Sequence, residues 1–353
     1  MLDDLQTVQR RDSQGMLRIL GRFDRQLEEA LALGEKAKLW SRPPAIKNIV
    51  ISGMGGSAIG GDFLRVYLGA DLNLPLQVSR SYGLPGFASR STLVFVCSYS
   101  GDTEESLSSF ERARRNGAQI ICLTSNGELG RLADSHGCPC IRLPEGYPPR
   151  SAIGYSAIPI LMVLGRLGLA PERAEEVRNS LAWVGRRIQI YGPDTPVEEN
   201  AAKSLATQMH RRVPVIYGSQ DRLDVIALRW RSQVAENAKQ LAYSGSLPEM
   251  NHNEIVGWNH PEPILESLLP IFLRDREDHP RVQIRSEITR EMLGDRAGSV
   301  LEYWSDGESW LERLWTLVLL GDYASVYLAF LNQENPTPVD EIAVLKDRLK
   351  EYP

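Results

Sequence analysis

Residues 48–62 read NIVISGMGGSAIGGD, and this stretch decides which fold the chain can adopt. A short β-branched run stops at small residues and Ser57, and a helix-like stretch follows. Residues 93–106, LVFVCSYSGDTEES, repeat the arrangement with a hydroxyl-rich turn. The N-terminus of a helix presents unpaired N–H groups and the positive end of the helix dipole, so each turn suits an anion. Two such turns from one sheet can converge on a single phosphate.

Length and composition narrow the class of protein. A chain of 353 residues exceeds the size at which one core usually keeps growing, so we expect two domains. The net charge is −5 and no lysine or arginine cluster forms a stripe, which argues against nucleic acid as a partner. No apolar run approaches the roughly 20 residues that span a bilayer, and residues 1–15 lack a signal-peptide core. We therefore expect a cytoplasmic protein without a membrane partner.

The four cysteines do not predict a metal site. Cys97 and Cys122 lie in apolar, strand-like runs, and Cys138 and Cys140 form an isolated C-P-C with only His136 nearby. A zinc site needs further ligands at suitable spacing, and the sequence contains no H-E-x-x-H motif. We expect ordinary buried thiols in a reducing compartment, and no cofactor.

Apolar runs alternate with helical patterns along the chain, which is typical of a parallel sheet covered by helices on both faces. The expected strands are Lys47–Ser52, Leu76–Ser79, Thr92–Cys97, Gln119–Leu123, Cys140–Leu143, Val213–Tyr217, Pro270–Leu273 and Ser299–Tyr303. The expected helices are Thr103–Asn116, Ala157–Leu169, Glu172–Ile190, Glu198–His210, Arg222–Leu241, Pro280–Leu293, Trp310–Leu331 and Val339–Leu349. The second half therefore reads as a diverged copy of the first.

The fold class expected from this pattern is α/β, with two domains that each hold a mainly parallel sheet flanked by helices. Two proline-rich breaks, LPEGYPPR at 143–150 and YGPDTPVEEN at 191–200, separate the halves. We therefore divide the chain into an N-terminal helical segment (1–40), a first domain with the phosphate-binding turns (41–150), a helical linker (151–194) and a second domain with a C-terminal helix (195–353).

The glycines of the first turn allow three interpretations. Gly53, Gly55 and Ala58 satisfy the dinucleotide fingerprint G-x-G-x-x-A. Such a site expects an acidic residue at the end of the next strand, about 20 residues on, where this chain offers Arg80 instead. Arg80 keeps an NADP site open, and the glycines can also serve only tight packing. Ser57 favours a phosphate, because its hydroxyl falls at the start of the helix.

The second turn separates these interpretations. It places the hydroxyls of Ser98, Ser100 and Thr103 around Gly101. A capping motif, in which Ser100 or Thr103 caps the following helix, explains one hydroxyl and not three. Three neutral donors with backbone N–H groups suit a dianionic phosphate and leave no buried lysine stranded when the site is empty. We therefore favour a phosphosugar site.

The motifs of both turns, GMGGSAIGGD (53–62) and SYSGDTEE (98–105), resemble the sugar isomerase (SIS) domain. Three later segments, VAENAK (234–239), MNHNEIVGW (250–258) and TPVDEIAVLK (337–346), resemble one branch of it, the bifunctional phosphoglucose/phosphomannose isomerases. The resemblance implies two SIS-like domains. It also implies an enzyme that interconverts glucose 6-phosphate, and mannose 6-phosphate, with fructose 6-phosphate by a metal-independent cis-enediol mechanism.

The group that moves the proton in such an enzyme can be a carboxylate whose pKa burial raises toward neutrality. Glu236 lies late in a largely apolar helical run, although the sequence alone also permits a solvated residue at a helix end. The resemblance makes Glu236 the catalytic base, with Glu254 of the N-H-N-E motif as its rival. From the two turns we expect the substrate phosphate to bind at Gly56, Ser57, Ser98, Ser100 and Thr103.

Three further residues have roles through the resemblance. Arg150, in PPRSAIGY, would stabilise the enediolate as a permanently charged planar donor, although by itself it could be an ordinary surface arginine. His252 would open the sugar ring and reach the active site of the adjacent subunit, which implies a homodimer. Lys346, otherwise an ordinary helix lysine, would contact the sugar ring and hydroxyls. Whether Thr337 helps to admit mannose 6-phosphate is left open.

The chain departs from the family pattern at Asp102, where asparagine is the commoner residue. We expect its carboxylate to point away from the phosphate, or phosphate affinity to suffer. The aromatic residues Trp304, Trp310 and Trp315 are expected in the core.

Two rival functions remain, a non-catalytic sugar-phosphate sensor and an NADP-dependent reductase. The sensor usually needs an attached DNA-binding segment, and residues 1–40, with one short helical pattern, look too small for one.

Overall fold

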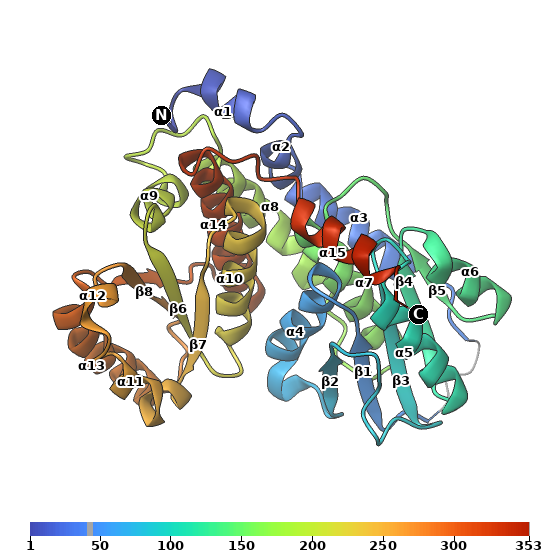
Figure 1. Ribbon diagram of the computed structural model, residues 1–353. Coiled ribbons are helices and arrows are strands. Elements are labelled where there is room, and N and C mark those ends of the chain that lie inside the picture. The colour runs from blue at the N-terminus through green and yellow to red at the C-terminus, as the bar shows by residue number, and fades with distance from the viewer. Residues whose placement is uncertain (41–44, 353) are drawn as a thin grey trace.

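The computed structural model describes residues 1–40 and 45–352, and it contains two parallel sheets, one in each half of the chain (Figure 1). The expected boundary at residue 41 lies outside the described residues. The strand order is β2-β1-β3-β4-β5 in the first sheet and β7-β6-β8-β9 in the second. The strands are β1 (Asn48–Ser52), β2 (Leu76–Ser79), β3 (Thr92–Cys97), β4 (Gln119–Thr124), β5 (Cys140–Arg142), β6 (Val213–Ser219), β7 (Tyr243–Leu247), β8 (Leu268–Arg274) and β9 (Leu301–Trp304).

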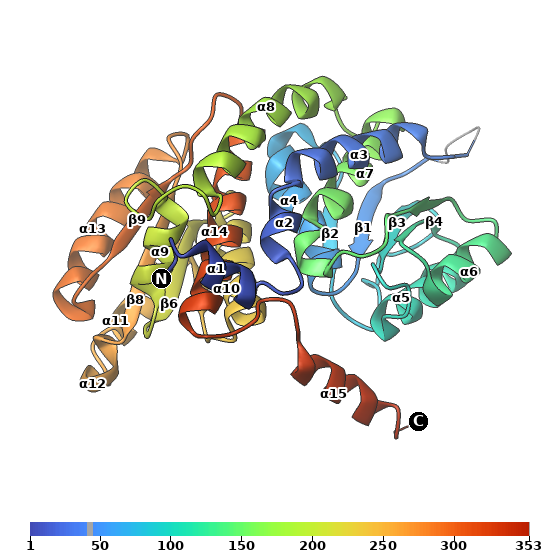
Figure 2. The same ribbon diagram turned by 90° about the horizontal axis from the view of Figure 1, so that it is seen from above.

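Helices surround both sheets and fill the space between them (Figures 1 and 2). In the first half they are α1 (Leu5–Arg11), α2 (Met16–Leu20), α3 (Phe23–Lys36), α4 (Gly56–Leu68), α5 (Glu104–Arg115), α6 (Gly127–Ser135) and α7 (Ile153–Arg166). In the second half they are α8 (Ala174–Tyr191), α9 (Ala201–Met209), α10 (Asp224–Ala238), α11 (Glu254–Gly257), α12 (Glu262–Leu265), α13 (Pro280–Ala297), α14 (Trp310–Leu331) and α15 (Asp340–Leu349).

The first sheet is buried on both faces, which is why its strands read as continuous apolar runs. Ile49 and Ile51 of β1 pack into the core that contains Phe63 of α4, together with α7. The intervening Val50 faces the opposite way, into a core with Phe110 of α5, together with α6. Successive residues of a strand thus serve two different helical layers.

The second sheet is built in the same way. Ile216 of β6 packs with Trp230 of α10 and with α9 and α14, in the same large core as the helices of the first sheet. The next residue, Tyr217, faces the outer layer, where Trp258 and Leu293 of the α11–α13 region pack. The two sheets therefore share one helical layer between them, and each has a second layer of its own.

Helix α14 lies in the shared layer and begins with a capping box between Ser309 and Glu312. By length and composition it could cross a membrane, so the sequence-based statement that no apolar run approaches that length is wrong for this helix. In the structure, however, 94% of its most apolar window is buried. Helix α14 is therefore the core helix on which α8, α9 and α10 pack.

The two ends of the chain differ from each other. Residues 5–36 form three helices rather than the one short pattern expected, and α3 packs on α7 and α8. At the other end, α15 leaves the body of the protein (Figure 2), and none of its residues is buried. The expected division of the chain into domains at residues 150 and 194 stays a prediction.

Other sequence-based expectations are corrected by the structure. Strand β7 (YSGSL) and helix α6 (GELGRLADS) were not expected. The sequence of β7 lacks a β-branched run, whereas α6 carries Leu129, Leu132 and Ala133 at helical spacing, a signal that the sequence analysis missed. Helix α10 ends at Ala238 instead of Leu241, since Lys239 has a left-handed backbone (φ 52°). Trp304 is 46% exposed because it ends the edge strand β9, whereas Trp315 lies in the core as expected.

Candidate active site

The first turn connects β1 to α4 and approaches another loop closely. A Cβ on Gly56 would lie 2.3 Å from the carbonyl oxygen of Pro149, so only glycine lets the turn come so near to the loop that carries Arg150. The hydroxyl of Ser57 accepts a hydrogen bond from the N–H of Tyr99 in the second turn (3.1 Å). The structure therefore brings together the two turns that the sequence singled out.

The second turn, between β3 and α5, is held by its own hydroxyls. Ser98 is buried; its Oγ donates to Oγ1 of Thr103 (2.9 Å) and accepts from the N–H of Gly101 (3.1 Å). Thr103 is the N-cap residue of α5 but makes no side-chain cap bond, and Ser100 is exposed. Ser57 and Ser98 also line a hollow of about 10 Å³. Ser98 thus orders the turn, while direct phosphate contacts stay a prediction.

Asp102 lies between these hydroxyls but serves another element. Its Oδ1 accepts a hydrogen bond from the N–H of Glu128, in the first turn of α6 (2.9 Å). A carboxylate at a helix N-terminus is stabilised by the unpaired N–H groups and the helix dipole there. The carboxylate of Asp102 therefore faces α6, in line with the expectation that it points away from a bound phosphate.

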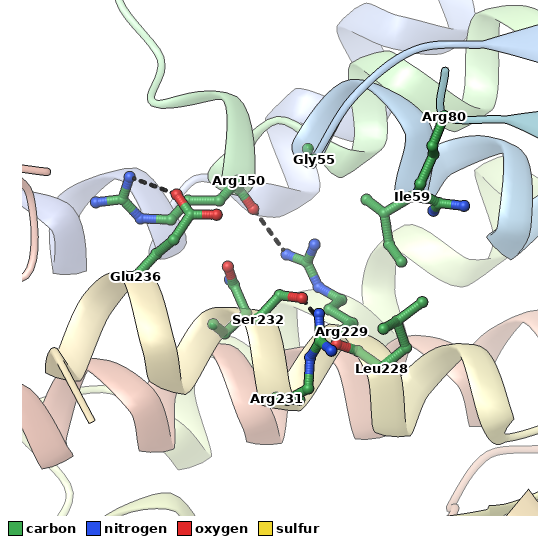
Figure 3. Close-up of a pocket in the computed structure, with 11 residues that line it drawn as sticks. Gly55, Ile59, Arg80, Arg150, Leu228, Arg229, Arg231, Ser232 and Glu236 are labelled. Carbon is green, nitrogen blue, oxygen red and sulfur yellow. Dashed lines mark hydrogen bonds and ion pairs between the residues drawn. The ribbon is translucent and has the colours of Figure 1, made fainter. Parts of the chain in front are cut away.

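A cavity of about 280 Å³ lies between α4 and α10 (Figure 3). Gly55 and Gly56 of the first turn close one side, Ser232 and Glu236 of α10 close the other, and Arg150 spans between them. The remaining lining residues are Ile59, Arg80, Leu228, Arg229, Arg231 and Gln233. Glu236, the predicted proton-transfer residue, therefore shares a cavity with Gly56, which is about half a chain away in sequence. The other predicted phosphate-binding residues, Ser57, Ser98, Ser100 and Thr103, do not line this cavity.

Arg150 is only 4% exposed, so its interpretation as a surface arginine is wrong. Its Nη1 donates to Oε2 of Glu236 (3.3 Å) and its Nε donates to Oδ1 of Asn237 (2.6 Å). Its Nη2 donates to the carbonyl oxygens of Pro336 (2.7 Å) and Thr337 (2.8 Å). Burial lowers the pKa of Arg150, and the Glu236 carboxylate offsets part of that effect. A guanidinium remains charged at neutral pH even so.

Sequence analysis missed three residues beside this cavity. Arg229, Gln233 and Asn237 are spaced four residues apart and are each 2% exposed. They form a buried polar stripe on α10, whose remaining buried residues are mostly apolar. The signal that could have found them is the i, i+4, i+8 spacing of polar side chains in a helix expected to be internal.

Two family profiles match the chain. The profile described as the SIS domain matches residues 45–148, and the bacterial phospho-glucose isomerase C-terminal SIS domain matches residues 198–349. The chain is 40% identical over 326 residues to the bifunctional phosphoglucose/phosphomannose isomerase of Caldicellulosiruptor bescii, which covers 92% of this chain and 96% of that protein. The chain belongs to the bifunctional phosphoglucose/phosphomannose isomerase family.

Other relatives agree with this family. The bifunctional phosphoglucose/phosphomannose isomerase of Aquifex aeolicus is 37% identical over 307 residues, which covers 87% of this chain and 91% of that protein. The crystal structure of a glucose-6-phosphate isomerase like protein from Thermus thermophilus superposes with a TM-score of 0.61 at 19% identity, covering 95% of this chain and 96% of that one. At that identity the likeness concerns the fold. The expected family and the α/β fold with two SIS domains are confirmed.

Three residues that the family resemblance singled out lie away from the cavity in this protomer. His252 is exposed on the 3₁₀ turn after β7, and Glu254 accepts a hydrogen bond from the hydroxyl of Tyr217. Lys346 lies on the exposed helix α15. None of the three lines the cavity between α4 and α10. Their roles in this member of the isomerase family stay predictions.

Two other residues of this isomerase family member bear on questions that the sequence left open: Thr337 on admission of mannose 6-phosphate, and Arg80 on an NADP site. Thr337 lies next to Arg150, and its hydroxyl is buried without a hydrogen-bond partner among the residues that the structure describes. Arg80 lines the cavity but is paired with Asp62, so it is engaged within the protein and does not stand free for a 2′-phosphate. Within residues 1–40 and 45–352, no group of three or more His, Cys, Asp or Glu side chains could hold a metal ion.

Proposed function

We propose that this chain interconverts fructose 6-phosphate with glucose 6-phosphate, and also with mannose 6-phosphate, without a metal ion or cofactor. Family membership supports this reaction. The two aldoses are epimers at C2 and give the same enediol, so one site can serve both if it leaves room at that hydroxyl. We further propose that the protein works in the cytoplasm on these small molecules, with neither nucleic acid nor membranes as partners.

One observation carries the proposal: a single cavity joins the turn at Gly55–Gly56 to the carboxylate of Glu236 and the guanidinium of Arg150. A phosphate held at one end leaves the reacting carbons of a hexose to lie across the cavity. The proposed phosphate-binding residues are Gly56, Ser57, Ser98, Ser100 and Thr103. Such anchoring of the non-reacting end favours reaction by fixing the orientation of the other end.

In the proposed reaction, Glu236 removes the proton from C1 of the ketose, and the electrons of that bond form the C1–C2 double bond of a cis-enediolate. The charge develops on the oxygen at C2, where the Arg150 guanidinium would stabilise it. A proton passes from the hydroxyl oxygen at C1 to the oxygen at C2. Glu236 then returns its proton to C2, and the oxygen at C1 becomes the carbonyl oxygen of the aldose. The Arg150 guanidinium lies 3.3 Å from the Glu236 carboxylate, so the base and the cation proposed for the enediolate stand side by side in the cavity.

Ring opening needs a further proton donor and acceptor. We propose that His252 of a second copy and Lys346 supply it in a homodimer. In support, both residues are exposed and lie outside the cavity of their own protomer, so they are accessible for a neighbouring copy. An imidazole ring has one nitrogen that can donate a proton and one that can accept it, which suits transfer of the ring-oxygen proton.

The test is isomerisation of fructose 6-phosphate in deuterated water with EDTA-treated protein. Proton transfer through Glu236 predicts glucose 6-phosphate and mannose 6-phosphate with deuterium at C2. The Glu236→Gln variant should lower kcat by at least about 10²–10⁴-fold while it still binds substrate. Product without solvent deuterium, formed equally by the wild type and by Glu236→Gln, would contradict the proposal.

The matched control is Glu254→Gln, which removes the same charge from the rival base. It should keep deuterium incorporation at C2, and loss of incorporation here with retention in Glu236→Gln would reassign the base. A sugar-phosphate sensor would instead bind fructose 6-phosphate tightly and release no aldose. An NADP-dependent reductase would shift or quench NADPH fluorescence, which we expect to stay unchanged.

A further inference from the structure

The buried polar stripe of α10 faces two polar residues of the core helix α14. Asn237 donates from Nδ2 to Oγ of Ser325 (2.9 Å), and Arg229 pairs with Asp322. Gln233 donates to the same Asp322 (2.8 Å). Five polar side chains thus meet across an otherwise apolar helix contact. Buried polar groups lower stability unless each one has a hydrogen-bond partner, and apolar residues would fill the same contact without that requirement. The polar set therefore points to a role other than packing.

Asn237 is fixed at both ends of its side chain. Its amide nitrogen donates to Ser325, whose hydroxyl in turn donates to the carbonyl of Asp322 (2.7 Å). The amide oxygen is thereby turned toward Arg150 and accepts from its Nε at 2.6 Å. The orientation of the amide follows from these partners, because only the oxygen can accept from Nε.

Arg229 supports the same arginine from its other side, through the backbone. Its Nη2 donates to the carbonyl oxygen of Arg150 (3.0 Å; Figure 3). The positive charge of Arg229 is balanced by Asp322, whose two oxygens lie 3.0 and 2.6 Å from Nε and Nη2. Arg229 therefore lines the cavity with its charge neutralised by Asp322. Arg150 differs from it in the kind of acceptor that its side chain contacts.

Arg150 is held mainly by neutral acceptors. Three of its four side-chain hydrogen bonds go to the amide oxygen of Asn237 and to the carbonyls of Pro336 and Thr337. The one carboxylate it touches, that of Glu236, is the proposed base and lies farthest, at 3.3 Å. Neutral acceptors fix the direction of a guanidinium without cancelling its charge, so the charge stays available to an oxyanion in the cavity.

We propose that Asn237, oriented by Ser325, is a positioning residue that aims the charged guanidinium of Arg150 at the enediolate. This inference rests on the proposed function of the cavity. Asn237 does not line the cavity, so its effect on the reaction passes through Arg150. Its uncharged amide is as important as its position, because a carboxylate in the same place would bind the guanidinium equally well and neutralise it.

The test measures kcat and KM for Asn237→Ala with fructose 6-phosphate. Misdirection of Arg150 should lower kcat by about 10²-fold, whereas KM should change by less than about threefold, because the phosphate anchor is untouched. Binding gives a second readout. Affinity for a phosphorylated aldonohydroxamate, a planar anionic analogue of the enediolate, should fall with kcat. Affinity for sorbitol 6-phosphate, a polyol that forms no enediolate, should not change.

The Asn237→Asp variant tests the role of the neutral acceptor. It keeps an oxygen for Nε of Arg150 but adds a charge and removes the donor to Ser325, so we expect some loss of stability and a fall in the kcat of the folded protein by about tenfold or more. The control is Trp230→Phe, which removes a hydrogen bond to the carbonyl of Leu317 (2.8 Å) in the same contact between α10 and α14. It should lower stability and leave kcat unchanged.

Two results would overturn the inference. One is full activity of Asn237→Asp, since the charge of the acceptor would then not matter. The other is an Asn237→Ala variant that resembles Trp230→Phe, less stable but with unchanged kcat. A wild-type protein without isomerase activity is a different result, because it contradicts the proposed function itself. The comparison of hydroxamate with sorbitol 6-phosphate then still shows whether Asn237 positions Arg150.

Discussion

The two sheets have similar strand pairing at the carboxyl ends of their strands, but different side chains occupy the loops there. We call these loop regions the first edge, in the first sheet, and the second edge, in the second sheet. In the first sheet, β1 and β3 lead into turns with small and hydroxyl residues, Gly56 and Ser57 in one and Ser98 in the other. In the second sheet the corresponding strands β6 and β8 also pair side by side, but the loop after β8 brings carboxylates to the edge. There Ser219, at the end of β6, donates to Oδ1 of Asp278 (2.6 Å).

Asp275 fills the second edge as a bound anion would. It is fully buried, and its Oδ1 accepts from Nη2 of Arg222 (2.7 Å) and from the N–H of Glu277 (2.9 Å). Its Oδ2 accepts from Nε of Arg313 (2.8 Å) and from the hydroxyl of Ser305 (2.5 Å). Cationic side chains, a hydroxyl and a backbone N–H are the groups that also recognise phosphate.

If the proposed phosphate site is correct, each sheet of this chain offers an anion site at its carboxyl edge, and the loop residues decide whether the chain's own carboxylate or a ligand occupies it. The second edge holds a carboxylate of its own chain and serves stability. The first edge keeps hydroxyl and glycine residues beside a cavity, and we propose that it binds an external phosphate. Each prediction below changes one edge and asks whether stability or activity responds.

The largest effect is expected from Asp275→Asn at the second edge. Loss of the carboxylate leaves Arg222 and Arg313 beside an uncharged amide, which should destabilise the fold by about 3–5 kcal/mol. The kcat/KM of the folded fraction should stay within about twofold of the wild type. Urea unfolding and steady-state kinetics measure the two quantities. A stable variant that has lost activity would show that the second edge takes part in the reaction.

A matched pair of glycine variants comes next. A Cβ on Gly56 would lie 2.3 Å from the carbonyl of Pro149, and one on Gly218 would lie equally close to the carbonyl of Leu223. Gly56→Ala should lower kcat/KM by about 10²-fold, because it displaces the loop of Arg150. Gly218→Ala should cost about 1–3 kcal/mol of stability and leave kcat/KM unchanged. Equal kinetic effects of the two variants would contradict the distinction between the edges.

The second edge should also respond to acid. Burial by itself raises the pKa of Asp275, but the bonds from Ser305 and Glu277 and the charges of Arg313 and Arg222 outweigh it, so the pKa lies below its ordinary value of 3.8. The ionised carboxylate therefore stabilises the fold above that pH, and its contribution is lost as the pH falls through the folded-state pKa. The stability difference between wild type and Asp275→Asn should shrink below pH 3.8. A stability difference that grows below pH 3.8 would contradict the lowered pKa of Asp275.

A serine at each edge gives a smaller contrast. Ser98→Ala removes the hydroxyl that orders the second turn through Thr103 and Gly101, and it should weaken fructose 6-phosphate binding by about tenfold. Ser219→Ala removes the bond to Asp278 and should cost about 1 kcal/mol of stability without changing affinity. Calorimetric titration and thermal unfolding of both variants provide the comparison. Unaltered affinity in Ser98→Ala would remove Ser98 from the phosphate site.

The smallest effect concerns Asp102, a carboxylate in the second turn of the first edge. Asp102→Asn keeps an acceptor for the N–H of Glu128 and removes a negative charge near the turn, so phosphate affinity should rise by about two- to threefold. The gain should fade at high salt, because exposed charges are screened. Titration of fructose 6-phosphate at two ionic strengths measures it. Weaker binding in Asp102→Asn would mean that the carboxylate helps the site.

Much of this follows from local sequence, and the rest depends on distant contacts. The first sheet and its turns were predictable because apolar strands and small turn residues can be recognised from a few neighbouring residues. The buried state of Arg150 was not, since its carbonyl partner Pro336 lies 186 positions away. The role proposed for Asn237 depends on contacts with the neighbouring helix α14, and strand β7 (Tyr243–Leu247) has no strand-like sequence. For His252, the expectation depends on a second copy.

The central claim is that Glu236 acts on a hexose whose phosphate is held at the first edge. A crystal structure with sorbitol 6-phosphate, which cannot isomerise, tests it most directly. We predict the phosphate at the Gly56–Ser57 and Ser98–Thr103 turns, with C1 or C2 about 3–3.5 Å from a carboxylate oxygen of Glu236. A phosphate bound at the second edge, or a sugar chain that runs away from Glu236, would contradict the account.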